Sequence, residues 1–189
     1  MRRALVSCLF AASLVVLPAS SQAQEMIHAL TGTVSEVDAA AKTITVLQDS
    51  GSEGVFHALT NAKTRIVFDK KIEAASTAAP AFDKQGAYAI VFYFGMDDNR
   101  TAVAVKSLGS GPFSSISGVV TKFDGHAHSI TVQDDSGTQQ SFRIDADTVA
   151  ETTLGVIVGL KLDGHKGDRV RIVSSQVNGA ATALFVRDL

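Results

Sequence analysis

Three histidines in the C-terminal half are the side chains best suited to chemistry. His126 and His128 are separated by one residue, and His165 lies in a second polar segment. If the first two lie at a strand end, their rings point to the same side, an arrangement that suits a divalent metal ion. The spacing supplies no third ligand, and histidines in exposed turns often have no ligand role, so we predict no metal site. Metal binding, or a metal-dependent activity, through these three residues is the alternative.

Other catalytic sets are incomplete in this sequence. No G-x-S-x-G segment is present to expose a nucleophilic serine. The carboxyl pair Asp134 and Asp135 precedes Ser-Gly, which is typical of a hairpin turn in which Asp bonds its own backbone. The glycine-rich segments 51–54 and 109–111 lack the lysine of a phosphate-binding loop. We therefore predict that the protein is not an enzyme and holds no cofactor.

The first 23 residues have the layout of a cleaved secretory signal. Arg2 and Arg3 precede an almost wholly apolar run over 4–17, which Pro18 ends, and Ala23 closes a small-residue cleavage pattern. The apolar run is too short for a comfortable membrane span. We predict that residues 1–23 are a signal peptide, that the mature chain is periplasmic or secreted, and that no membrane span remains after cleavage.

The composition of the mature chain excludes several classes of protein. Cys8, the single cysteine, lies inside the signal, so no disulfide, cysteine-ligated zinc or cysteine nucleophile is expected after cleavage. Of 17 basic residues, removal of Arg2 and Arg3 leaves 15, against 19 acidic ones. The mature net charge is thus 15 − 19 = −4, spread along the chain without blocks. This balance argues against a nucleic-acid binder.

The mature chain contains the same sequence pattern twice. Residues 30–59 and 116–145 align without a gap at an offset of 86, with 11 identities. The later parts align at an offset of 81, at which Gly86 matches Gly167. An internal repeat of this kind indicates duplicated domains. We predict a first repeat over 26–108, a linker over 109–113 and a second repeat over 114–189.

Within each repeat, apolar residues alternate with polar ones. In Ile44-Thr45-Val46 and its counterpart Ile130-Thr131-Val132, β-branched residues recur at every second position, which is typical of half-buried strands. Gly32 and Gly118 occupy equivalent places inside the first strand, where a glycine often marks a bulge or bend. The expected strands lie at 30–37, 42–48, 54–59, 87–94 and 101–107 in the first repeat, and at 116–123, 128–134, 140–144, 168–174 and 182–187 in the second.

The order of these elements indicates the fold. Three strands, a connector and two further strands is the order of an OB-type barrel. We therefore predict an all-β protein of two tandem five-stranded OB-like small barrels, each with a short helical or irregular connector between strands 3 and 4. The first connector covers 61–80, and residues 148–162 of the second form either a helix or an extra strand. An open sheet or a sandwich is the alternative architecture, since pattern alone determines strand order poorly.

Turn and core residues recur in both repeats in a fixed order. In the second repeat they are Gly118, Val120, Asp124, Ile130-Thr131-Val132, Gly137, Phe142 and Gly167-Asp168-Arg169-Val170. This pattern resembles the tandem small OB-like β-barrel domains of unknown function in exported bacterial proteins. The first repeat departs from it at Gly86-Ala87, where the acidic turn residue is missing. Because the shared residues belong to turns and core, the resemblance implies the fold and no activity.

The fourth strands of the two repeats differ on one face. In the second repeat Arg169 and Arg171 occupy the outer positions. The same positions of the first repeat carry an apolar and aromatic stripe. This stripe consists of Tyr88, Ile90, Phe92 and Phe94. It is either covered by the connector or the second repeat, or open to a protein or peptide partner or an apolar ligand.

Duplication, export and the missing catalytic set together predict a non-catalytic binding or scaffolding module of the bacterial envelope, with a ligand that the sequence does not identify. The first alternative is the metal-binding protein described above. The second, by analogy with OB-type barrels alone, is a binder of an oligosaccharide or a single-stranded polymer. We expect no nucleic-acid partner, and the lack of Trp removes the best stacking residue for a sugar.

Overall fold

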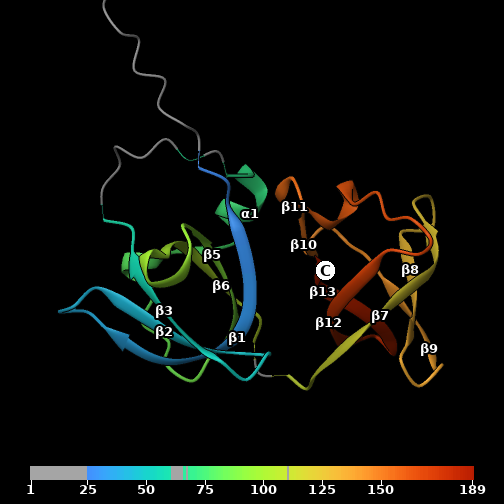
Figure 1. The fold of residues 1–189 in the computed structure, drawn as a ribbon, viewed down its shortest axis with the longest axis horizontal. Coiled ribbons are helices and arrows are strands. Elements are labelled where there is room, and N and C mark those ends of the chain that lie inside the picture. Colours follow the sequence, from blue (N-terminus) through green and yellow to red (C-terminus); the bar gives the residue numbers. More distant parts are fainter. Residues whose placement is uncertain (1–24, 61–65, 67, 110) are drawn as a thin grey trace, which may run out of the picture.

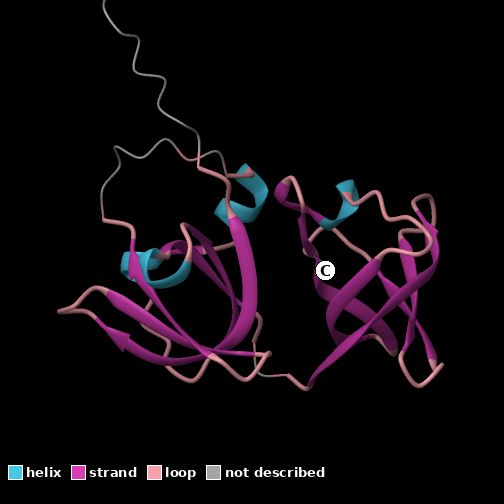
Figure 2. Cartoon of the chain, viewed as in Figure 1, coloured by secondary structure: helices cyan, strands magenta, loops and turns pink. Residues whose placement is uncertain are grey.

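The structure is a computed structural model that describes residues 25–189 except 61–65, 67 and 110. The predicted signal peptide lies outside the described residues. Strands are the main secondary structure of the described chain, and the few helices are short pieces (Figure 2). The N-terminal and C-terminal halves make two β bodies that lie side by side (Figure 1).

The first β body is a closed barrel. Its main strands are β1 (His28–Asp38), β2 (Thr43–Gln48), β3 (Glu53–Ala58), β5 (Tyr88–Phe94) and β6 (Thr101–Ser107). The strand order is β3-β2-β1-β5-β6, and a parallel pairing of β3 with β6 closes the ring. This closed five-strand order is that of an OB-type barrel, so the predicted fold class is confirmed.

The second β body repeats the same strand order. Its strands are β7 (Phe113–Asp124), β8 (Ser129–Asp134), β9 (Gln139–Arg143), β12 (Arg169–Val177) and β13 (Ala180–Asp188). A parallel pairing of β13 with β9, at Thr182 and Arg143, joins the two ends of the order. Phe113 starts β7, where it pairs with Ser175, although the sequence pattern placed it in the linker.

The connectors between the third and fourth strands differ between the repeats. The first connector holds α1 (Lys70–Ala74), β4 (Thr77–Ala78) and the 3-10 turn η1 (Ala79–Ala81). The second holds a hairpin of β10 (Val149–Thr152) and β11 (Gly155–Val158), followed by η3 (Gly159–Lys161). β10 pairs in parallel with β13, so this sheet has seven strands and not five. A remaining 3-10 turn, η2 (Asp97–Asn99), joins β5 to β6.

The first strand of each barrel bends at the glycine that the sequence singled out. The first half of β1 pairs with β5 and its second half with β2, so Gly32 lies where the strand passes from one neighbour to the other. A Cβ atom at Gly118 would collide with the carbonyl oxygen of Gln133, and one at Gly32 with that of Leu47. The register irregularity begins two residues beyond each glycine. The glycines therefore permit the close approach of two backbones that barrel closure requires.

We expect Gly118→Ala to lower the free energy of unfolding by about 1–3 kcal/mol, because the added Cβ must push β8 away from β7. Chemical denaturation of the full chain measures this loss. Gly125→Ala is the matched control, since its Cβ would meet no atom closer than 3.7 Å. Equal stability of the two variants would contradict the close-approach explanation.

The two barrels share a hydrophobic cluster in addition to their separate cores. From the first repeat it contains Ile27, Ala29, Ile72, Ile90, Phe92 and Ala104, and from the second Val149, Val158, Val173 and Phe185. At the offset of 81, Phe92 is equivalent to Val173 and Ala104 to Phe185. Each repeat thus presents the same face to the other, as in an isologous interface between identical subunits.

Polar contacts flank this shared cluster. Lys106 Nζ donates to the carbonyl oxygen of Asp147 at 2.7 Å, and Lys161 Nζ donates to Asp69 Oδ2 at 3.1 Å. Burial lowers the pKa of Lys106. Each contact joins one repeat to the other. Among the described residues, no helix has the length and apolar character needed to span a membrane.

Candidate functional site

The three histidines that were candidates for metal binding lie in two separate exposed turns. His126 and His128 lie in the turn between β7 and β8, not at a strand end, and His128 has a φ of 49°. Lys42, at the equivalent place in the first repeat, has a φ of 56°, so this turn requires a left-handed residue in both repeats. The expectation that strand alternation aligns the two rings is therefore wrong. In the described part of the chain, no three His, Cys, Asp or Glu side chains converge as a metal site.

The apolar stripe of β5 lies between the two barrels. Ile90 and Phe92 are fully buried in the shared cluster, where Phe92 lies 5.0 Å from the ring of Phe68. Tyr88 stacks on Phe113 at 4.8 Å, and Phe94 is partly buried against the same cluster. The second repeat and the connector therefore cover the stripe. These residues therefore form an internal interface and not an open face for a partner.

One hollow that the sequence did not reveal lies at one end of the second barrel. It has a volume of about 350 Å³, and we call it the barrel-end cavity. Its floor is formed by four buried core residues, Val120, Ile130, Val170 and Val186. Its walls and rim are formed by Thr152, Thr153, Leu154, Ile157, Lys161, Leu162, Asp163, Gly164, His165, Asp168 and Asp188. Residues of the barrel core thus form the deepest wall of this hollow.

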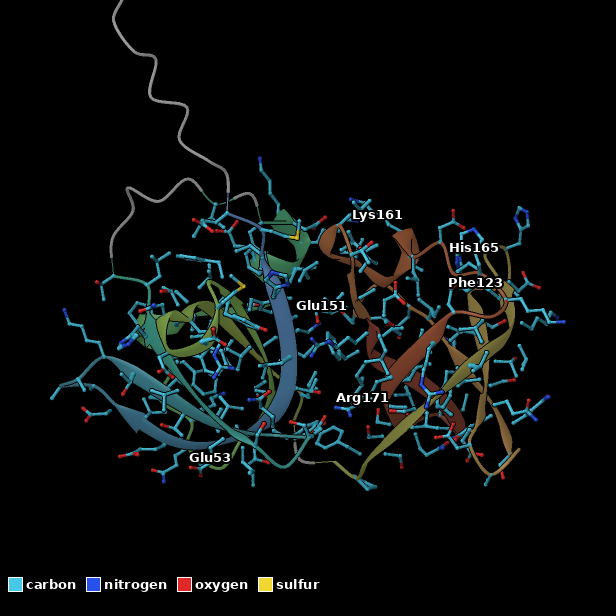
Figure 3. The ribbon with its side chains drawn as sticks, viewed as in Figure 1. Glu53, Phe123, Glu151, Lys161, His165 and Arg171 are labelled. Atoms are coloured by element: carbon cyan, nitrogen blue, oxygen red, sulfur yellow. The ribbon has the colours of Figure 1, made fainter. Side chains whose placement is uncertain are left out.

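The loop after η3 forms one side of this cavity and has a defined local structure. Asp168 Oδ2 accepts a hydrogen bond from the backbone nitrogen of His165 at 2.6 Å, which fixes the turn. Gly164 lies against Phe123, whose ring would come within 3.1 Å of an added Cβ. Figure 3 shows Phe123, Lys161 and His165 along this end of the second repeat. Of the predicted histidines, only His165 lines the cavity.

The cavity combines an apolar interior with a polar rim. Leu154, at the tip of the β10–β11 hairpin, is 87% exposed, and Leu160 is 43% exposed. The exposure of these leucines is visible only in the structure, and sequence reasoning missed this hollow. An apolar pocket with a few polar groups at its mouth is the usual form of a small-molecule site. The arrangement can bind a ligand, and it brings together no nucleophile with a general base.

A smaller cavity of about 250 Å³ lies at the corresponding end of the first barrel. Ile44, the equivalent of Ile130, contributes to it, together with residues 79–83 of the connector. Its charged lining residues have both signs, because Lys42 lies with Asp38 and Asp83. The two barrels therefore have hollows at corresponding ends that differ in size and in the number of carboxylates.

A separate buried polar cluster lies at the interface between the repeats. Glu151 on β10 has an exposed fraction of 6%, with Oε1 3.2 Å from His28 Nδ1 and Oε2 3.2 Å from Arg187 Nε. The contact with Arg187 lacks hydrogen-bond geometry, so Oε2 has no hydrogen-bond donor among the described residues. Burial raises the pKa of Glu151, although Arg187, the amide of Ala29 and His28 act in the opposite direction. We interpret this cluster as part of the interface, because both repeats contribute to it and cover it (Figure 3).

Fold and site together define an all-β protein of two OB-type barrels with a ligand-sized hollow at the end of the second. No protein-family model and no curated protein matches the chain. Among solved structures, the chain is similar to apo-CusF residues 6–88 from Escherichia coli, with 18% identity and a TM-score of 0.33. The match covers 44% of this chain and 94% of that chain. At this level the likeness carries no conclusion about ligands.

Proposed function

We propose that the protein is a non-catalytic, exported binding protein whose barrel-end cavity takes a small ligand with an apolar body. The observation that carries the proposal is a hollow of about 350 Å³ whose lining combines core residues of the second barrel with a polar rim. This volume lies at the lower end of the range for small-molecule sites, roughly 300–1,000 Å³. The ligand is therefore small.

The protein leaves part of the apolar surface at this cavity uncovered. Ile157 and Leu162 line the cavity and are only partly buried, and Leu154 beside them is almost fully exposed. Covering apolar surface stabilises a complex by roughly 25 cal/mol per Å² before the costs of association. A ligand with an apolar body gains this energy, whereas a fully polar ligand does not.

The export and the absence of catalysis in this proposal rest on different observations. Export is supported by the signal-like first 23 residues. The rim group that most resembles an acid–base pair is His165 with Asp168, whose side chains are 3.8 Å apart. Asp168 Oδ2 already accepts the backbone hydrogen bond that holds the loop. We therefore assign Asp168 to loop structure and not to proton transfer.

The experiment uses 4-phenyl-1-butanol as a neutral probe with an apolar body. We expect Thr153→Trp to weaken its binding at least about tenfold, which corresponds to about 1.4 kcal/mol, because the indole occupies the mouth of the cavity. Thr153 is exposed in the hairpin turn, so the fold tolerates the change. Calorimetric titration gives the affinity, and backbone amide shifts show whether the residues lining the cavity respond.

Ser52→Trp is the matched control, because Ser52 is exposed in the turn between β2 and β3 of the other repeat. It should leave the affinity for the probe unchanged. The proposal fails if the wild-type protein does not bind the probe, or if Thr153→Trp binds it as tightly as the wild type does.

A further inference from the structure

We infer that the ligand of the barrel-end cavity is a small organic cation, in which a protonated amine lies next to the apolar body. This inference rests on the proposed function, because it assigns a charge to the ligand of the same site. The cavity supplies the apolar contact, and the carboxylates at its rim select the charge.

Three carboxylates line the rim of the cavity, from Asp163, Asp168 and Asp188. Among the described residues, no lysine or arginine nitrogen lies within 4 Å of their oxygens. The nearest basic group is the imidazole of His165, whose Nδ1 is 3.8 Å from Asp168 Oδ2. The rim thus offers negative charge that the protein itself does not pair with lysine or arginine.

Three basic side chains near this cavity have carboxylate partners outside it, and Lys166, in the same loop, is exposed and does not line the cavity. Lys161, which also lines the cavity, places its Nζ 3.1 Å from Asp69 of the first repeat. Arg169 lies 3.2 Å from Asp135, and Arg187 lies 3.2 Å from Glu151. Each of these three cations has a carboxylate partner outside the cavity, so a cationic ligand does not have to displace any of them.

The physical basis for selection is the low-dielectric floor beneath the rim. A hollow with apolar walls and an excess of negative charge at its mouth, here three aspartates against Lys161, concentrates the field there. An ammonium group held at the rim is attracted to three carboxylates, whereas a carboxylate ligand is repelled by the same groups. Each such exposed pair contributes little, so the preference comes from their sum.

The smaller cavity of the first barrel can be compared with the barrel-end cavity of the second. Its lining contains Lys42 together with two carboxylates, and Asp38 Oδ1 already accepts hydrogen bonds from the amides of Ala40 and Ala41. That rim has two carboxylates and one lysine, whereas the rim of the barrel-end cavity has three carboxylates and one lysine, Lys161, which is paired with Asp69. We therefore assign the cation preference to the second barrel.

The test compares three probes that share one apolar body and differ only in the charge of the head group. They are 4-phenylbutylamine, 4-phenyl-1-butanol and 4-phenylbutyrate, titrated into the full mature chain at low ionic strength. We expect the amine to bind about tenfold more tightly than the carboxylate, with the alcohol between them. The difference should shrink as salt is added, because the rim charges are exposed to solvent.

The double variant Asp163→Asn with Asp188→Asn tests the origin of the preference. It should weaken binding of the amine at least about threefold more than it changes binding of the alcohol, so that the ratio of the two affinities falls. Asp98→Asn, in the exposed turn η2 of the first repeat, is the control and should change neither affinity.

The outcomes separate the two proposals. If none of the three probes binds, the proposed function itself is wrong. If all three bind at the cavity with equal affinity, or the carboxylate binds best, the cavity is a binding site and the inference of a cationic ligand is overturned. A preference for the amine that survives the double variant also overturns it, because the charge then comes from elsewhere.

Discussion

Replacing Phe92 by alanine should lower the free energy of unfolding of the full chain by about 3–5 kcal/mol. Phe92 is fully buried, and it packs in the cluster to which both repeats contribute. Its ring also lies 5.0 Å from that of Phe68, so the truncation removes contacts on several sides. The cavity that remains adds to the lost transfer energy, since two barrels of fixed shape collapse around it only partly.

The position of Phe92 predicts a second effect besides lower stability. A shared apolar interface couples the unfolding of two domains into one transition. Weakening this interface should let the two barrels unfold at different denaturant concentrations, so that one sharp transition becomes two. Hydrogen exchange by mass spectrometry should show faster exchange in β5 and in β12 and β13, which meet at the interface.

Val55→Ala is the control for this experiment. Val55 lies on β3 and is 48% exposed, so the same kind of truncation should cost less than about 1 kcal/mol there. If Phe92→Ala costs no more than the control, the face of β5 is not covered in solution. The stripe would then again be a candidate face for a partner.

The sequence predicted the barrels well because the signals that define them are local. Alternation in Ile44-Thr45-Val46 and in Ile130-Thr131-Val132 assigns strands, and the second copy supports the assignment made for the first. All ten main strands lie within a few residues of their predicted bounds. The exception is the run 148–162, which is apolar without clear alternation and therefore left helix and strand open. The structure resolves it as the β10–β11 hairpin.

The residues that cover the outer face of β5 were not predictable from the alternation of apolar and polar residues. Alternation placed Phe92 on the outer face of β5, but it cannot show that Val173 and Phe185 of the other repeat meet it. Val173 lies on the same side of its strand as Arg171. The outer face of this strand therefore carries an apolar residue as well as the arginines, and the sequence analysis considered only the arginines. A search for apolar residues at equivalent outer positions of both repeats would have found the interface.

The candidate site was less predictable than the fold, for two physical reasons. His128 was interpreted as a strand residue, whereas the left-handed turn at this position decides where its ring points. The barrel-end cavity depends on how the hairpin and the loop to Asp168 pack over the barrel, which no local periodicity encodes. The exposure of Leu154 at the tip of the hairpin is known only from the structure.

The second large effect on stability that we expect comes from the loss of Arg187, the cation next to Glu151. Three groups face its carboxylate: Arg187 on the neighbouring strand β13 of the same repeat, and His28 on β1 and Tyr93 on β5 of the other repeat. Glu151 is the one charged residue of the hairpin strands, and it is buried where the two repeats meet. Removing its cation leaves a buried carboxylate with less compensation, which is among the costly changes in proteins.

We expect Arg187→Met to lower the free energy of unfolding at pH 7 by about 2–4 kcal/mol. The value lies below the top of the range for a broken buried ion pair, because His28 remains and the side chain of Arg187 is itself 38% exposed. Methionine retains most of the apolar contact of the arginine stem. Chemical denaturation at a series of pH values measures the loss.

The pH dependence has a definite sign. Burial raises the pKa of Glu151 above its ordinary value of 4.5, and Arg187 lowers it, so loss of Arg187 raises it further. A carboxyl group with a raised pKa in the folded state contributes stability that is complete below its unfolded pKa and is lost as the pH rises through the folded pKa. The penalty of Arg187→Met should therefore be small below pH 4.5 and reach its full size above the folded pKa.

Glu151→Gln distinguishes the electrostatic explanation from simple loss of packing. In that background the carboxylate is absent, so Arg187→Met should cost less than about 1 kcal/mol and its cost should not vary between pH 4 and pH 8. A penalty of equal size at all pH values, or one that persists in the Glu151→Gln background, would show that Arg187 stabilises the interface through its stem alone. Disappearance of the penalty in acid and in the double variant would identify Glu151 as a titrating carboxyl buried between the two barrels.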